Sequence, residues 1–289
     1  MKKRKDTYFF KILALAVLLC IIAGFLAFCG RKTEPEKETE TPPQVSVEPT
    51  DPTPPTTPPQ VFTKTLQERM IEKAARYYGV SVDAYPESMV ELLTRNRETQ
   101  GFVLAYPDEI KKERTVDMSA YKNTQGVPLF MQWDRQWGYN QYGQSIAALN
   151  GCGPVSLSMV AYYYTRDDAM APDKMLEYAY EKGYCTPGYG TAWTLISKGA
   201  VDLGFTVKEL PNVKRSVMRE LEAGHPIILN VGPGDFTTTG HYMVMVGVED
   251  GLIRINDCNS YANSSKLWDF DQIESQIRNM WAISYEGNT

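Results

Sequence analysis

The feature that most constrains how this chain can fold is a proline-rich stretch at residues 41–60, TPPQVSVEPTDPTPPTTPPQ, which holds eight of the 18 prolines. No apolar side chain within it is larger than valine. A segment of this composition cannot bury enough apolar surface to form a core. We therefore predict a disordered linker at residues 31–62, so that any folded domain has to follow it.

A second segment, at residues 1–30, precedes this linker. Four basic residues at positions 2–5 are followed by an uncharged stretch at residues 12–29, ILALAVLLCIIAGFLAFC, close to the ~20 residues that a membrane-spanning helix needs. Basic residues before a span stay in the cytoplasm, so we expect an anchor with the rest of the chain outside. A cleaved signal peptide and lipidation at Cys29 are alternatives, and each of them also exports the protein.

The linker has a length that suits a role at the cell surface. Proline-rich chains extend by about 3.1 Å per residue, so residues 31–62 could hold a domain up to roughly 90 Å from the membrane. This reach is enough to cross a cell wall. A tether without any selected length fits the sequence equally well.

Residues 63–126 carry a helical pattern. Leu66, Met70, Ile71 and Ala74 recur at spacings of three and four, as in amphipathic helices. Pro86 and Glu87 suit a helix start, because proline is tolerated in the first turn and an acidic side chain favours the positive end of the helix dipole. We interpret this segment as a helical prelude that packs against or positions the domain at residues 127–289.

Within that domain, Cys152 stands between two glycines in ALNGCGPVSLSMVAYYY, directly before a long apolar run that predicts a buried helix. Unpaired N–H groups at a helix start favour an anion, so they lower the pKa of a thiol there. Gly151 and Gly153 would let a substrate carbonyl approach the backbone N–H of Cys152. A structural cysteine is the alternative, and only a partner base makes Cys152 a nucleophile.

Two histidines are the candidates for that base. His225 precedes Pro226 and a buried strand, so we expect it to be a turn residue. His241 opens an apolar strand in GHYMVMVGVEDGLIRIND, and Asp-Gly between two such strands indicates a β-hairpin. His241 is therefore the predicted base.

The register of this hairpin selects the third group. If the loop spans residues 249–251, His241 and Asp257 lie one diagonal step apart on the same face of the sheet. A two-residue loop favours Asn256 or Cys258 instead. We expect the longer loop, with Asp257 orienting the imidazole.

The segments QWDRQWGYNQYG, GCGPVSLSMV, GHYMVMVGV and IND together resemble papain-like cysteine peptidases. The resemblance is to the bacterial group related to peptidases that remove bacteriocin leader peptides after a double glycine, and it covers about residues 127–289. It implies an α+β fold in which a helical lobe with the nucleophile at a helix N-terminus packs on an antiparallel β-sheet. By the same resemblance, Cys152 is the nucleophile, His241 the base and Asp257 the orienting acid.

One position departs from the simplest papain pattern, in which a glutamine six residues before the nucleophile completes the oxyanion hole. Ile146 stands there. Gln132 and Gln144 are the remaining donors, and we favour Gln132 because its motif belongs to the resemblance. Trp133 and Trp137 are expected in the core or the cleft wall.

A glycine-containing loop and two further cysteines give only weak indications of function. Within residues 183–205, glycines and Tyr189 form a loop before a predicted helix that starts near Thr191, and we assign this loop no catalytic role. Cys185 and Cys258 show no spacing motif, so we do not expect a disulfide between them, although disulfides persist outside the cell.

The composition argues against several functional classes. Two histidines and no CxxC pair leave no zinc site to propose, and no cofactor is expected. A net charge of −5 argues against binding nucleic acid. We predict an exported peptidase that acts on a peptide or protein at the membrane or cell wall. A cell-wall amidase, a transglutaminase-like acyl transferase and a non-catalytic binding module are the alternatives.

Overall fold

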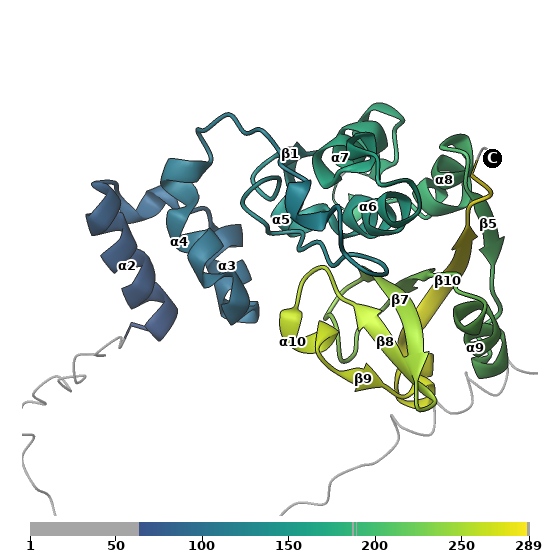
Figure 1. The fold of residues 1–289 in the computed structure, drawn as a ribbon. Helices are drawn as coiled ribbons and strands as arrows, with labels where there is room; N and C mark the ends of the chain where they lie inside the picture. Colours follow the sequence, from purple (N-terminus) through teal and green to yellow (C-terminus); the bar gives the residue numbers. More distant parts are fainter. Residues whose placement is uncertain (1–63, 187, 189, 288–289) are drawn as a thin grey trace, which may run out of the picture. The chain divides into compact units, whose positions relative to one another are not determined.

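The computed structural model describes residues 64–186, 188 and 190–287, which belong to one compact unit (Figure 1). The expected anchor at residues 1–30 and the linker at residues 31–62 lie outside this range. Among the described residues, no helix is both long enough and apolar enough to span a membrane. The boundaries at residues 63, 126 and 127 stay predictions.

Three helices form the prelude, as the apolar spacing predicted: α2 (Leu66–Tyr78), α3 (Glu87–Arg95) and α4 (Gln100–Glu109). Pro86 is the N-cap of α3 and Glu87 its first residue, which confirms the predicted start. Thr65 and Glu68 form a capping box on α2. The apolar stripes of α2 and α3 meet in a shared core that includes Ile71 and Met89.

The prelude and the following domain share this core. Phe102 of α4 stacks on Tyr139, with ring centroids 3.9 Å apart, and the Tyr139 hydroxyl donates to the Phe102 carbonyl at 2.7 Å. Ala148, which lies four residues before Cys152, is buried in the same cluster. The prelude is therefore packed directly against the segment that leads to the candidate nucleophile.

The helical lobe is centred on α6 (Cys152–Thr165), which is buried along most of its length, as its apolar sequence predicted. Trp137 lies fully buried in the same cluster. The other helices of residues 127–287 are short or peripheral: α5 (Ala147–Asn150), α7 (Pro172–Glu181), α8 (Ala200–Asp202), α9 (Lys214–Glu222), α10 (Tyr261–Ser264) and α11 (Phe270–Ile273).

A six-stranded antiparallel sheet packs against this lobe, in the order β5-β10-β6-β7-β8-β9 (Figure 1). Its strands are β5 (Thr206–Glu209), β6 (Ile227–Val231), β7 (His241–Glu249), β8 (Leu252–Asn256), β9 (Leu267–Trp268) and β10 (Ile277–Ser284). Two small ribbons add β1 (Gln141–Tyr142) with β2 (Ser145–Ile146), and β3 (Cys185–Thr186) with β4 (Gly190–Thr191). The predicted α+β fold class is confirmed.

The β7–β8 hairpin differs from the sequence prediction. Its turn has two residues, Asp250 and Gly251, both with positive φ (51° and 78°), rather than the three that we expected. A β-bulge between Met245 and Gly247 then shifts the register by one residue, so that Val244 pairs with Asn256. The bulge restores the register that a three-residue loop would have given, and Asp257 faces His241 after all.

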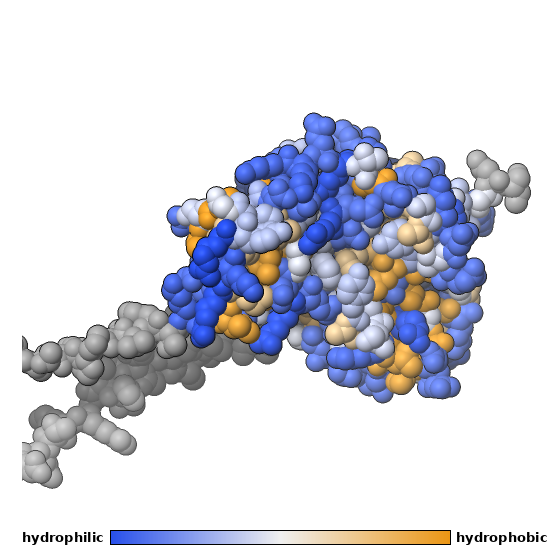
Figure 2. All heavy atoms as spheres, turned by 60° about the vertical axis from the view of Figure 1, so that its left-hand side comes forward, coloured by the Kyte–Doolittle hydropathy of each residue, from blue (hydrophilic) through white to orange (hydrophobic). Residues whose placement is uncertain are grey.

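The view in Figure 2 shows a mainly hydrophilic face with hydrophobic residues in separate patches. Among the described residues, the most exposed apolar side chain is Tyr77, on α2. Scattered apolar side chains are normal on a protein surface and need no functional explanation. Buried polar residues are more informative about a functional site.

Candidate active site

Cys152 is the first residue of α6, so its backbone N–H is one of those that a helix leaves without an intrahelical partner. Gly153 follows because there is no space for a side chain: a Cβ there would lie 2.7 Å from the Cβ of Thr191. Pro154 suits the first turn, where a missing N–H is tolerated. The GCGP sequence thus allows the tight entry that presents the half-buried thiol at the helix end.

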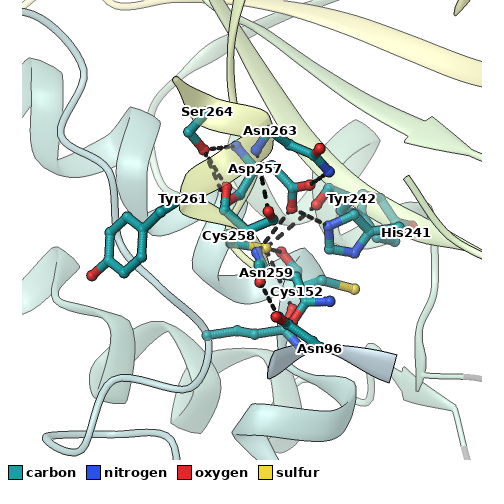
Figure 3. Close-up of polar contacts among 12 residues, drawn as sticks. Asn96, Cys152, His241, Tyr242, Asp257, Cys258, Asn259, Tyr261, Asn263 and Ser264 are labelled. Atoms are coloured by element: carbon teal, nitrogen blue, oxygen red, sulfur yellow. Dashed lines mark hydrogen bonds and ion pairs between the residues drawn. The ribbon is translucent and has the colours of Figure 1, made fainter. Parts of the chain in front are cut away.

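His241 and Asp257 are brought to Cys152 by the sheet. His241 begins β7 and Asp257 follows β8 directly, so the hairpin places the two side chains together, with His241 Nε2 2.7 Å from Asp257 Oδ1. The ring leaves Nδ1 for the thiol, and Figure 3 shows the Cys152 sulfur beside the imidazole. The three sequence-predicted residues therefore lie in series, with the thiol beside the imidazole and the imidazole hydrogen-bonded to the carboxylate (Figure 3).

The Asp257 carboxylate is held from several sides. Its Oδ1 also accepts the Asn259 backbone N–H at 2.8 Å, and its Oδ2 accepts the Asn263 side-chain amide at 2.8 Å (Figure 3). The Asp257 N–H donates to Ser264 Oγ at 2.9 Å. The sequence analysis missed these partners, although the run of small polar residues after Asp257 is typical of a loop that hydrogen-bonds to itself.

The electrostatics of the three groups favour an ion pair. Burial raises the pKa of the Cys152 thiol, but the His241 hydrogen bond and charge, with the backbone N–H groups of Tyr242 and Gly153, outweigh it, so that the pKa is lowered. Burial lowers the pKa of His241, but the charge of Asp257, together with the neighbouring thiols of Cys258 and Cys152, raises this pKa well above its usual value. Burial likewise raises the pKa of Asp257, and the imidazolium beside it brings the value below normal.

A cleft of about 360 Å³ opens onto these groups. Cys152, His241 and Gln132 line it together. Leu92 and Asn96 from the prelude and the loop at residues 234–239 line it as well. The cleft therefore gives a substrate access to the thiol and the imidazole.

Gln132 lies in this cleft, whereas Gln144 lies in a separate depression beside Pro86. The Gln132 side-chain amide donates to the Ala148 carbonyl at 2.7 Å, and its Oε1 accepts the Cys258 thiol at 3.4 Å. These contacts fix which end of the amide is the donor, and among the described residues they leave the second N–H of Nε2 without an acceptor in the cleft that Cys152 also lines. Gln132 is thus the better placed of the two predicted oxyanion donors.

Cys258, which a two-residue loop would have favoured as the third group, lies beside the site and contacts Gln132. Its thiol is fully buried, contacts Gln132 and the Tyr242 carbonyl, and has a pKa raised to about 11 chiefly by burial. It therefore remains a neutral hydrogen-bond donor at ordinary pH. No sequence signal marks this role, because any small residue could follow Asp257.

Several residues with alternative assignments lie elsewhere. His225 sits before the start of β6 and contacts Glu220 at 3.2 Å, while the other end of β6 pairs with His241. Asn256 donates to the carbonyls of Val127 and Pro128 instead of orienting the imidazole. Among the described cysteines, Cys185 and Cys258 are both free.

Within the described part of the chain, His241, Asp257 and Cys258 are the one trio with ligand atoms close together, all within 4.8 Å of one another. The histidine nitrogen and the carboxylate already share a hydrogen bond. Cys258 is a protonated thiol, whereas metals bind the thiolate. This trio is thus better described as part of the hydrogen-bonded site than as a metal centre.

A buried helix that presents a thiol to the His241 end of an antiparallel sheet defines a papain-like cysteine peptidase. Residues 124–287, more than half of the chain, match the model of the Peptidase_C39-like family, and the chain belongs to this family. It is therefore a cysteine peptidase, a hydrolase that acts on a peptide or protein. The prelude helices lie outside the matched residues.

Several solved structures are similar to this chain, including the following two. One is the peptidase domain of Streptococcus ComA, a bifunctional ABC transporter of a quorum-sensing pathway, with 20% identity over 55% of this chain and 99% of that domain and a TM-score of 0.38. The other is a C39-like peptidase from Bacillus anthracis, with 16% identity over 61% of this chain and 99% of that one and a TM-score of 0.34. No curated protein matches the chain.

Proposed function

We propose that the chain hydrolyses peptide bonds through an acyl-enzyme on Cys152, with His241 as the base and Asp257 as the orienting group. The observation that carries this proposal is the Cys152 thiol beside the His241 imidazole, which is itself hydrogen-bonded to the buried Asp257 carboxylate, in an open cleft (Figure 3). A lowered thiol pKa beside a raised imidazole pKa is the arrangement that activates a cysteine nucleophile.

In the first half of the reaction, the Cys152 thiolate attacks the scissile carbonyl carbon and forms a C–S bond. The imidazolium of His241 then gives its proton to the leaving amine as the C–N bond breaks. In the second half, neutral His241 takes a proton from water, the hydroxide attacks the thioester, and the acid product leaves as the thiolate is restored. Asp257 keeps its charge throughout and stabilises the cationic imidazole.

The oxyanion formed in each half needs hydrogen-bond donors. The backbone N–H of Cys152, at the start of α6, supplies one of them, and the free N–H of Gln132 supplies the second. Donors held in place before the reaction stabilise the tetrahedral intermediate without any reorganisation. The fixed amide of Gln132 meets this requirement.

The nucleophile assignment is tested with Cys152→Ser. We expect loss of hydrolysis of a peptide library with the fold retained, because a hydroxyl lacks the acidity that the helix start and His241 exploit. Cys185→Ser, at the other half-buried cysteine, is the matched control and should keep the parent activity. A Cys152→Ser protein that cleaves as fast as the parent would exclude this mechanism.

We also propose that the peptidase acts outside the cytoplasm, held to the membrane by residues 12–29. The support is the basic start, the uncharged stretch and the proline-rich linker in the sequence. Protease added to intact cells that express the chain should cut within residues 31–62, because an unpacked tether is readily cleaved. Cleavage only after lysis would place the domain inside the cell.

A further inference from the structure

The prelude contributes directly to the surroundings of the candidate active site. Leu92, Arg95 and Asn96, at the end of α3, line the same cleft as Cys152 and His241. These residues lie outside the segment that the family model matches. The cleft of this chain is thus partly built by residues that the peptidase family does not account for.

The turn after α3 also holds the loop that carries Asp257. Glu98 lies in the 3-10 turn η2 (Arg97–Thr99), and its carboxylate accepts Ser260 Oγ at 2.7 Å, the Tyr261 N–H at 2.7 Å and the Ala262 N–H at 3.3 Å. These donors lie at the start of α10, so a single carboxylate of the prelude binds the exposed N–H groups of that short helix. Hydrogen bonds to an ionised acceptor are stronger than neutral ones.

Asn96 adds a second connection. Its Oδ1 accepts the Glu98 N–H at 3.0 Å, and its Nδ2 donates to the Asn259 carbonyl at 2.6 Å. Trp133 donates to the same carbonyl at 3.0 Å, and its ring meets the Tyr261 ring edge to face. The chain from residue 259 to residue 262 is therefore fixed to the prelude at several adjacent points.

The segment held in this way is the one that orients Asp257. Asn263 and Ser264 of α10 bind the Asp257 carboxylate and backbone, and Ser260 Oγ accepts the Asn263 N–H at 3.1 Å (Figure 3). A movement of α10 would carry Asn263 and Ser264 away from Asp257. The hydrogen bond from Asp257 to His241 would then lose its fixed geometry.

We infer that the prelude is part of the catalytic unit and that Glu98 is a positioning residue, which holds α10 so that Asp257 orients His241. This inference rests on the proposed roles of Asp257 and His241. It assigns a functional contribution to helices that sequence analysis interpreted as a packing or positioning segment. Glu98 lies more than 160 positions before the loop that it holds. Among the described contacts of Ser260, Tyr261 and Ala262, it is the one charged group.

The test is a double-mutant cycle on the full-length chain, read as the rate of iodoacetamide alkylation of Cys152 at pH 6. The proteins are the parent, Glu98→Ala, Asp257→Ala and the double variant. If Glu98 acts through Asp257, Glu98→Ala raises the pKa of Cys152 and slows alkylation at pH 6 toward the rate of Asp257→Ala. In the Asp257→Ala background the same change should have no further effect, since the two residues act in series.

Two more variants control for the chemistry. Glu98→Gln keeps the size and one acceptor, so it should fall between the parent and Glu98→Ala. Glu87→Gln changes the same side chain at an exposed position of α3 and should match the parent. The melting temperature of each variant is measured alongside. A lowered melting temperature indicates a folding defect, whereas an unchanged one assigns the change in alkylation rate to the thiol itself.

Three outcomes overturn the inference. Parent-like alkylation in Glu98→Ala, with slow alkylation in Asp257→Ala, removes the role of Glu98 and leaves the proposed function intact. Equal slowing by Glu98→Ala with and without Asp257 means that Glu98 acts only on general structure. Parent-like alkylation in Asp257→Ala removes the role of Asp257 itself, and the positioning role falls with it.

Discussion

Gln132→Ala separates the stabilisation of the oxyanion from the activation of the thiol. Loss of one oxyanion donor lowers kcat by about 10² to 10³, or about 2.7 to 4 kcal/mol of transition-state stabilisation. The reactivity of Cys152 toward iodoacetamide should stay close to that of the parent, since the thiol pKa is set by His241 and backbone N–H groups and not by Gln132. Turnover and alkylation should therefore diverge in this variant.

The stability of Gln132→Ala can be worked out from the same contacts. Gln132 is 4% exposed, and its removal takes the amide donor from the Ala148 carbonyl, while the Cys258 thiol keeps the Tyr242 carbonyl as an acceptor. A buried polar group without a partner costs about 1 to 3 kcal/mol. This loss is smaller than the usual 5 to 15 kcal/mol of folding stability, so we expect a folded variant with a lowered melting temperature.

The assay is steady-state hydrolysis of a peptide substrate selected from a library, with alkylation and thermal unfolding measured on the same samples. Gln144→Ala is the matched control, because Gln144 lies in a different depression. If Gln132→Ala retains the parent kcat, or if Gln144→Ala loses as much, the assignment of the oxyanion donor is wrong. Equal losses of turnover and alkylation in Gln132→Ala would point to a damaged thiol environment instead.

Two further predictions concern the imidazole. Asp257→Asn should lower the pKa of His241 and raise that of Cys152, because the charge that stabilises the imidazolium is gone. The bell-shaped pH profile of kcat/KM should therefore narrow from both sides. An unchanged profile would contradict the orienting role of Asp257. His241→Ala should remove the reactivity of Cys152 at low pH, whereas His225→Ala should leave it, since His225 contacts Glu220 at the other end of β6. Alkylation rates across pH distinguish the two histidine variants.

The sequence predicted those structural elements that depend on residues close together along the chain. The run after Cys152 predicted α6 because its residues are apolar on nearly every side, and Pro86 with Glu87 predicted the start of α3. Asp-Gly predicted the β7–β8 turn because both residues tolerate positive φ. These features depend on neighbours within a few positions, which a single sequence displays directly.

Other features depend on contacts that a single sequence does not display. The bulge between Met245 and Gly247 was not predicted, although an isolated glycine within a strand suggests one, so the register that brings Asp257 to His241 was expected for the wrong reason. The contacts of Glu98 with α10 join segments more than 160 residues apart. Apart from the Ser260 hydroxyl, their partners are backbone N–H groups, which every residue except proline carries, so no side-chain pattern predicts them.

The most direct test of the thiolate–imidazolium pair is the pH dependence of iodoacetamide alkylation in the parent protein, with the modified positions mapped across its five cysteines. Cys185 and Cys258 are internal references, because burial raises the pKa of both thiols, whereas that of Cys152 is lowered. The account predicts that Cys152 reacts first and already at pH 6, well below the ~8.5 at which an ordinary thiol ionises. A Cys152 that titrates near ~8.5, or that reacts no faster at pH 6 than Cys185, would contradict it.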